Sequence, residues 1–251
     1  SIATVAGVSL VTRSTQEEFG TRLEVAEGRT VGKEPQGAAP GTVVEVRHLF
    51  RNFPARRMFL RSTATETSRI QTLVTRYALA YPEVKFQLKV ENSEAFSSAG
   101  SGDLREAVSA VYGLEVAQAM LEISTDSGEQ EEHPLHISGM TSPPSVDRAN
   151  RSYISLFVNR RWVQSRMLTY ALEQAYRDFL MERRHPLAVV NIGLSYMEVD
   201  VNVHPAKSEV RFRRENQVFA ALQKAARHTL ITHSPVPEIS RVKVTQPGPA
   251  G

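Results

Sequence analysis

Cysteine is absent from the 251 residues of this sequence, which excludes disulfide bonds, thiolate metal sites and cysteine nucleophiles. No run of about 18 apolar residues occurs, so the sequence predicts no membrane-spanning helix. The opening residues, SIATVAGVSLVTRS, lack a basic start followed by a long apolar core, and we expect no secretory signal. A strong charge of one sign is also lacking: 30 basic residues stand against 27 acidic ones, and the net charge of +3 by itself indicates no class of partner.

What is present is the composition of a soluble globular protein, with 41% hydrophobic and 23% charged residues. The length allows one large domain or two ordinary ones. The sequence starts without Met and directly in a strand-like pattern, so we expect it to be part of a longer protein. Among the basic residues, 24 are Arg and 6 are Lys. This bias suits forked phosphate contacts, but a GC-rich genome would produce it as well.

Strand-like and helix-like periodicities are intermingled along the whole sequence, which predicts an α/β (α+β) fold. Alternation predicts strands in the first part of the chain and again from Gly41. Between them, residues 31–41 are rich in Gly and Pro and predict a loop. Residues 166–184 have the apolar spacing of one long amphipathic helix.

The small, polar and glycine-rich segment at residues 97–102 is the best internal boundary. It predicts one domain at residues 1–98 and a second at residues 103–232. The residues from 233 to 251 are rich in Pro and predict an extended segment.

A basic segment with interleaved aromatic residues follows the strand predicted from Gly41. It contains FRNFPARRMFLRS, in which Arg56 and Arg57 follow Pro54 and lie between phenylalanines. Arginines among aromatic residues can bind nucleic acids through phosphate contacts and stacking. The same pattern arises when the phenylalanines belong to the core and the arginines form a solvated rim, so both interpretations stay open.

The stretch VDVNVHPAKSEVRF carries a single lysine, Lys207, between two predicted strands. Its first half alternates apolar and polar residues, and Pro205 then ends the strand because proline lacks a backbone donor. Lys207 is thus expected on a short, stiff connection, where a point charge can contact a phosphate group. A solvated surface lysine is the alternative, because no Walker loop is present to hold the rest of a nucleotide.

Two other places carry candidate residues. Gly41 permits a close approach of the backbone and Thr42 offers a hydroxyl, although an ordinary loop-to-strand junction would look the same. The sequence Asn159-Arg160-Arg161 is predicted to end a strand, where adjacent side chains point to opposite faces, so only one arginine should lie on a binding surface. The histidines lack the paired spacing of metal ligands, and no nucleophile–base pair can be recognised.

Three stretches together resemble the MutL family of DNA mismatch repair proteins, in its order and at its spacing. They are GTVVEVRHLFRNFPARRMFL, ISGM…SYISLFVNRRWV and VDVNVHPAKSEVRF, and the resemblance covers about residues 1–232. It implies part of a GHKL-type ATPase α/β sandwich, the fold of type II topoisomerase B subunits and histidine kinases, in residues 1–98. Residues 103–232 are then expected to resemble domain 2 of ribosomal protein S5, and residues 233–251 to begin an interdomain linker.

The resemblance implies ATP and Mg²⁺ as cofactors of the parent protein, which is expected to be an ATPase. Lys207 is expected to reach the γ-phosphate of ATP from the second domain, and Gly41 and Thr42 to lie in the nucleotide pocket. The family's general base, Mg²⁺-binding Asn and lid motif are expected to precede Ser1, so no catalytic residue and no metal ligand are assigned here. These residues alone are therefore expected to bind ATP poorly and not to hydrolyse it.

The resemblance also implies DNA binding that is largely independent of base sequence. Arg161, which ends the family's FVNGR motif, is the main candidate, and Arg56 and Arg57 are further ones. Arg160 replaces the glycine of that motif, which adds bulk and charge to the turn.

For the parent protein, the resemblance implies an ATP-gated dimeric clamp, either a homodimer or a MutL-type heterodimer, which works with a MutS-type mismatch sensor and not with a membrane. The expected location is the cytoplasm, or the nucleus if the source is a eukaryote. Two alternatives stay open. One is a non-enzymatic nucleic-acid-binding module with an S5-like fold, and the other is a different member of the same ATPase superfamily.

Overall fold

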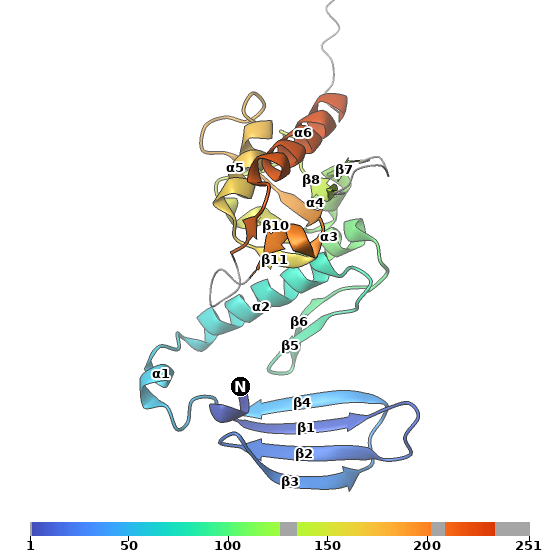
Figure 1. Cartoon of the computed structure of the whole chain (residues 1–251), viewed down its shortest axis with the longest axis vertical. Helices are drawn as coiled ribbons and strands as arrows, with labels where there is room; N and C mark the ends of the chain where they lie inside the picture. The colour runs from blue at the N-terminus through green and yellow to red at the C-terminus, as the bar shows by residue number, and fades with distance from the viewer. Residues whose placement is uncertain (1, 126–134, 202–208, 234–251) are drawn as a thin grey trace, which may run out of the picture. The chain divides into compact units, whose positions relative to one another are not determined.

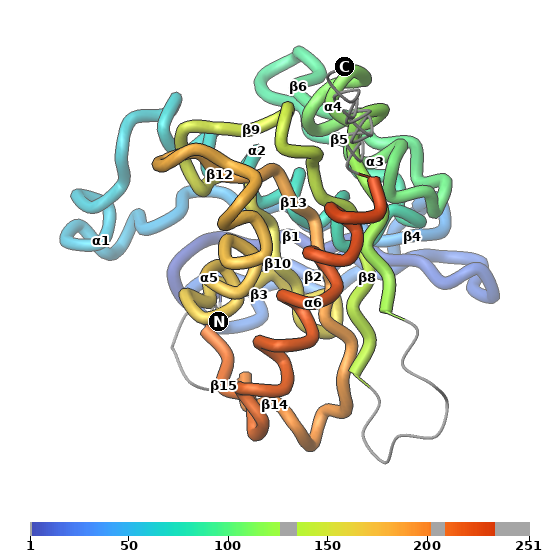
Figure 2. Tube along the Cα trace, turned by 90° about the horizontal axis from the view of Figure 1, so that it is seen from above, coloured from blue at the N-terminus to red at the C-terminus, as the bar shows by residue number. Residues whose placement is uncertain are grey.

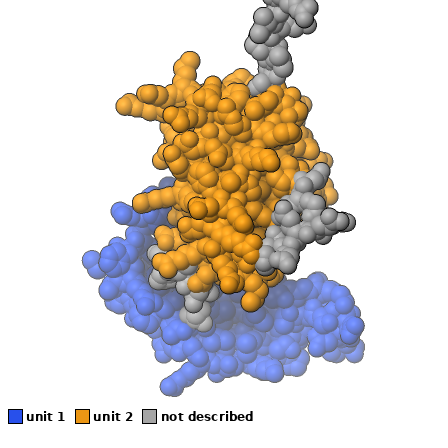
Figure 3. All heavy atoms as spheres, turned by 45° about the horizontal axis from the view of Figure 1, so that its top comes forward, with its two compact units in different colours: residues 1–69 blue, residues 70–251 orange. Residues whose placement is uncertain are grey.

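The computed structural model describes residues 2–125, 135–201 and 209–233, with helices and strands intermingled along the chain (Figure 1). The chain divides into two compact units, Ser1–Arg69 and Ile70–Gly251 (Figure 3). Both units combine helices and strands, which confirms the predicted α/β (α+β) class.

A single helix, α2 (Thr63–Ala80), joins the two units, because the division falls between Arg69 and Ile70. The domain boundary predicted at residues 98–103 lies further along the chain, between β6 (Ser93–Ser97) and α3 (Leu104–Tyr112). Both of these elements belong to the second unit, and the boundary at 98–103 stays a prediction.

The first unit is built on a four-stranded antiparallel sheet in the order β3-β2-β1-β4. Its strands are β1 (Gly7–Arg13), β2 (Gly20–Ala26), β3 (Arg29–Gln36) and β4 (Gly41–Arg47). The prediction of a loop at residues 31–41 is wrong in its first half, because β3 extends to Gln36. Pro35 is tolerated in β3 because this is an edge strand, where one missing backbone donor need not break a ladder.

The second unit contains a five-stranded sheet in the order β11-β10-β13-β8-β7. The strands are β7 (Leu121–Ser124), β8 (His136–Thr141), β10 (Ile154–Val158), β11 (Arg161–Val163) and β13 (Ala188–Gly193). β10 and β13 run parallel, and the other neighbours are antiparallel.

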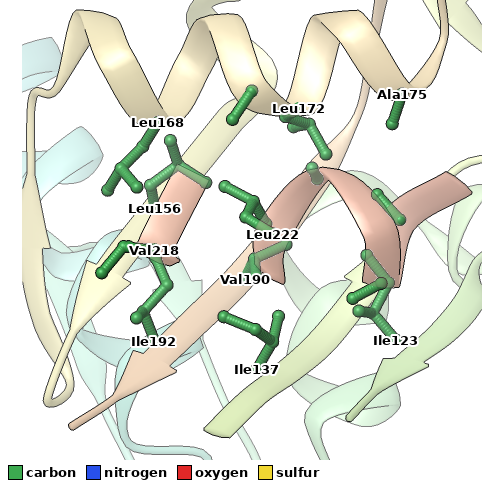
Figure 4. Packing of buried hydrophobic residues seen from close by; sticks show 14 of the residues in the cluster. Ile123, Ile137, Leu156, Leu168, Leu172, Ala175, Val190, Ile192, Val218 and Leu222 are labelled. Carbon is green, nitrogen blue, oxygen red and sulfur yellow. The ribbon is translucent and has the colours of Figure 1, made fainter. Parts of the chain in front are cut away.

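Helices cover both faces of this sheet. On one face, α5 (Arg166–Ala175) and α6 (Glu215–His233) lie side by side (Figures 1 and 2). Leu172 and Leu222 of these helices are fully buried against the strands (Figure 4). Burying such a side chain contributes about 1.5–3 kcal/mol. The opposite face packs its apolar residues against α3, α4 (Leu114–Ala119) and the end of α2.

The remaining elements of the described chain are short. They are η1 (Ile2–Thr4), α1 (Pro54–Met58), β5 (Gln87–Val90), β9 (Asp147–Arg148), η2 (Arg151–Tyr153), β12 (His185–Pro186), η3 (Tyr196–Glu198), β14 (Val199–Asp200) and β15 (Arg211–Phe212). β5 pairs with β6, β9 with β12, and β14 with β15. Within the residues that the structure describes, no helix combines the length and the apolar character needed to cross a membrane.

The end of α5 is set by a buried tyrosine. The helix ends at Ala175, so the prediction of one helix over residues 166–184 is wrong beyond this residue. The Tyr176 side chain is buried, and its hydroxyl donates a hydrogen bond to the Ser142 carbonyl at 2.5 Å and contacts the Thr141 hydroxyl at 2.6 Å. Burial raises the pKa of Tyr176 well above its usual value, although both hydrogen bonds oppose the shift.

We expect the substitution Tyr176→Phe to lower the free energy of unfolding by about 1–3 kcal/mol at neutral pH, because the Ser142 carbonyl loses its side-chain donor. The raised pKa adds a second effect. The contribution of Tyr176 to the free energy of unfolding should be fully present below about pH 10, the pKa of an unfolded tyrosine. It should fall as the pH rises above this value, because the tyrosine ionises more readily in the unfolded chain. The phenylalanine variant should lose this alkaline component.

Urea unfolding between pH 7 and pH 11 measures both effects. Tyr170→Phe in α5 is the control, because Tyr170 is 55% exposed. Equal alkaline slopes for wild type and Tyr176→Phe would contradict the assignment.

Candidate functional site

Lys207 lies outside the described residues, together with the rest of residues 202–208. Its contact with a phosphate group therefore stays a prediction. The segment belongs to the connection between β14 and β15, which pair antiparallel with Val199 opposite Phe212. Two strands thus flank the lysine in the chain, as the alternation predicts.

Gly41 and Thr42 begin β4 at one end of the first sheet. The φ angle of Gly41 is +130°, a backbone conformation that L side chains rarely adopt, and a Cβ atom would meet nothing within 4 Å. Glycine is thus required for its backbone and leaves open space beside it. The Thr42 hydroxyl lies 2.8 Å from that of Thr12 on β1, and all three residues are at least partly accessible. The hydroxyls of Thr12 and Thr42 thus lie beside a glycine that has open space where a side chain would stand.

The basic segment around α1 is exposed from Arg51 to Ser62. Arg56 and Arg57 lie on this one-turn helix, and the Arg56 guanidinium stacks over the Phe53 ring at 5.3 Å. Phe59 is 84% exposed, so its interpretation as a core residue is wrong. Neither arginine has an ion-pair partner in the described part of the chain, which leaves both available to an anionic ligand.

The turn between β10 and β11 contains the first two residues of the candidate motif. Val158 pairs with Arg161, so Asn159 and Arg160 form a two-residue hairpin loop. Their φ angles are +48° and +66°, and a two-residue loop with positive φ at both positions matches the twist of antiparallel strands. The prediction that the three residues end one strand is therefore wrong, because Arg161 is the first residue of the next strand.

The Arg160 side chain binds the end of α2 and the residues that follow it through two of its three nitrogens. Its Nε donates to the carbonyl of Ala80 at 2.9 Å, and its Nη2 contacts both carboxylate oxygens of Glu83 at 2.5 and 2.6 Å. The guanidinium also lies 4.3 Å from the centre of the Tyr81 ring. The hydrogen bonds from Arg160 are the main cause that lowers the pKa of Glu83.

The Arg161 side chain is exposed and has no hydrogen-bond or ion-pair partner in the described ranges of the chain. Of the two adjacent arginines, only Arg161 is thus available to a ligand. The prediction that one of the pair lies on a binding surface agrees with this division, and Arg160 is the one used internally.

The backbone of the turn is held by β13 and by the residue after it. The Asn159 amide donates to the carbonyl of Leu194 at 2.9 Å, and its oxygen accepts from the Leu194 N–H at 3.0 Å. The Arg160 N–H donates to the side-chain oxygen of Asn191 at 2.8 Å. Arg161 is therefore presented by a turn that is fixed on two sides.

An open cavity of about 1160 Å³ near β11 is lined by arginines that sequence reasoning did not identify. Arg76 of α2 stacks over the Trp162 ring at 3.7 Å, whereas Arg151 is held by Glu173 at 2.6 Å. No local spacing could have grouped these residues, because the lining arginines come from separate elements: Arg76, Arg151 and Arg166. Nothing in the described ranges groups three or more His, Asp or Glu residues for a metal ion.

The family described as "DNA mismatch repair protein, C-terminal domain" matches residues 108–231. The DNA mismatch repair protein MutL of Limosilactobacillus reuteri (strain DSM 20016) is 39% identical over 239 residues, which are 95% of this chain. This chain belongs to the MutL family. The MutL protein of Symbiobacterium thermophilum is 41% identical over 230 residues, 92% of this chain. The chain spans about a third (35%) of the length of both relatives.

Among solved structures, the Aquifex aeolicus MutL ATPase domain complexed with ADP is similar to this chain with a TM-score of 0.61 and 29% identity. The match covers 77% of this chain and 70% of that one. The similarity confirms the predicted architecture, in which part of a GHKL-type ATPase sandwich is followed by an S5-like domain.

We expect Asn159→Ala to lower the free energy of unfolding by about 2–4 kcal/mol. The variant loses two hydrogen bonds to Leu194 and places alanine at positive φ. Asn159→Gly is the matched variant, because it loses the same bonds but accepts the backbone conformation, and it should be about 1 kcal/mol more stable than the alanine variant. Urea unfolding measures the difference, and wild-type stability in both variants would contradict the stabilising role of the Asn159 hydrogen bonds.

Proposed function

We propose that this chain is part of an ATP-gated, dimeric DNA clamp that couples mismatch recognition to downstream repair. The observation that carries the proposal is the exposed Arg161 side chain, which has no ion-pair partner among the described residues and is presented by a fixed turn. Membership of the MutL family supports the clamp, the MutS-type partner and the dimer. A relative in the same family is an ATPase domain complexed with ADP, which supports the nucleotide.

Arg161 suits a phosphate group better than a base. A guanidinium offers parallel N–H donors that match two phosphate oxygens. Contacts of this kind position DNA without reading its sequence, and their strength falls as the salt concentration rises. Arg56 and Arg57 of the first unit offer the same chemistry, since both are exposed and lack a carboxylate partner in the described ranges. DNA bound by these residues would be held by its backbone.

The start of β4 fits the polar part of a nucleotide. Gly41 leaves space where a side chain would otherwise stand, and the hydroxyls of Thr42 and Thr12 lie beside it. Lys207 would add a positive charge for the terminal phosphate. ATP supplies the phosphoanhydride bond, and Mg²⁺ neutralises its phosphate charge. The described residues offer no cluster of metal ligands, so none of them is assigned to Mg²⁺.

A non-enzymatic nucleic-acid module is the second candidate. It is favoured by the fact that the Arg161 turn and all its supporting contacts belong to the second unit. The two candidates differ in one measurable property. The clamp predicts that ATP changes the DNA affinity of a MutL protein carrying this chain, whereas the module predicts the same affinity with and without ATP.

We expect Arg161→Glu to weaken the binding of duplex DNA at low salt on the order of tenfold. Loss of one phosphate contact should also reduce the slope of log affinity against log salt by about one. Fluorescence anisotropy with a labelled duplex over a salt series measures both quantities. The fold should be intact, because no described residue depends on the Arg161 side chain.

Arg183→Glu is the matched control for charge reversal. Arg183 is exposed and precedes the start of β13, which pairs with the start of β10, whereas Arg161 follows the end of β10. The control should retain near-normal affinity. If Arg183→Glu weakens binding and Arg161→Glu does not, DNA lies at the other end of the sheet.

A further inference from the structure

The Asn159–Arg160 turn connects two parts of the chain that are far from it in sequence. The Arg160 side chain holds the last residue of α2 and Glu83, which is 77 residues away. The Asn159 side chain holds Leu194, which directly follows β13. After Leu194 the described chain continues through η3 and β14 to Val201. The turn is therefore bonded to the end of α2 on one side and to the segment that leads into β14 on the other.

The contact with α2 has the chemistry of a specific helix cap. The last carbonyls of a helix lack intrahelical donors, and a cation near the C-terminus is favoured by the helix dipole. The Arg160 Nε satisfies the carbonyl of Ala80, the final residue of α2. Its Nη2 pairs with both oxygens of Glu83, and the guanidinium lies over the ring of Tyr81. Lysine could not supply these contacts together, because it has no planar fork.

The backbone at Arg160 disfavours this residue. A φ angle of +66° suits glycine, and an arginine there is retained against the steric preference of its own backbone. The side-chain contacts offset that cost. A glycine at position 160 would relieve the backbone strain but would lose the contacts with Ala80 and Glu83. The backbone conformation therefore favours glycine at this position, whereas the contacts with the end of α2 require arginine.

We propose that Arg160 is a positioning residue that fixes the end of α2 to the turn carrying Arg161, so that a change in α2 is transmitted to the DNA contact. α2 is the covalent connection between the two units, and the Arg160 tether is defined here as the contacts of Arg160 with Ala80, Tyr81 and Glu83. The role of Arg161 in this inference rests on the proposed function. Arg160 itself is not assigned a phosphate contact in this inference, because its Nε and Nη2 already bind Ala80 and Glu83.

Two single variants and their combination test the Arg160 tether in a MutL protein carrying this chain. Arg160→Gly removes the side chain and suits the backbone, whereas Glu83→Gln keeps the shape and removes the charge. Each should raise the amide hydrogen exchange rate in the last turn of α2 by about threefold to fivefold, the range of a partly exposed ion pair. The double variant should exchange no faster than Arg160→Gly, because the ion pair that Glu83→Gln weakens is already lost in that variant.

The second measurement is the change in duplex DNA affinity caused by a non-hydrolysable ATP analogue. Both variants should reduce this change at least threefold and leave the affinity without nucleotide within about twofold of wild type, because Arg161 is still present. A merely structural role would leave the nucleotide effect intact. Glu91→Gln is the control, because Glu91 is an exposed carboxylate in the β5–β6 turn of the same unit.

The outcomes separate the two claims. Unchanged exchange in both single variants overturns the tether. Raised exchange with an unchanged nucleotide effect overturns the transmission. If Arg161→Glu leaves DNA affinity unchanged with and without nucleotide, the proposed function fails and the link to Arg161 fails with it, whereas the tether is still decided by the exchange measurement.

Discussion

Two consecutive non-glycine residues at positive φ form the constraint on which the candidate site depends. Asn159 and Arg160 adopt this conformation at a steric cost of about 1–2 kcal/mol for a side chain, less for asparagine. Hydrogen bonds to Leu194 and Asn191 and the ion pair with Glu83 offset that cost. Because both side chains are used to hold the turn, the next residue in the chain starts β11 from a fixed point.

The partners of the arginines, and not their number, indicate function in this chain. Arg151, Arg184 and Arg227 each bind a carboxylate and thereby join separate parts of the chain. Arg161 has no such partner in the described residues, although it lies next to the paired Arg160. A protein with a net charge of only +3 can therefore present local positive charge to a polyanion. Composition cannot distinguish these two groups.

Alternation predicted β10, four of whose residues are buried, and it also predicted β4, although every residue of β4 is exposed. The glycine and proline of β3 concealed an edge strand. Helical periodicity continued past Ala175, yet Tyr176 turns into the core and ends α5. Arg161 was identified through the family motif. The partner of Arg160 could not be identified, because Glu83 lies 77 residues away and no local pattern encodes that distance.

The central claim is that Arg161 faces DNA while its neighbour Arg160 does not. Site-specific photo-crosslinking tests it most directly, with a photoreactive residue placed at position 161 in one protein and at position 160 in another, each irradiated with duplex DNA. We expect position 161 to yield a DNA adduct and position 160 to yield little or none. An adduct at position 160 equal to or stronger than that at position 161 would contradict the account.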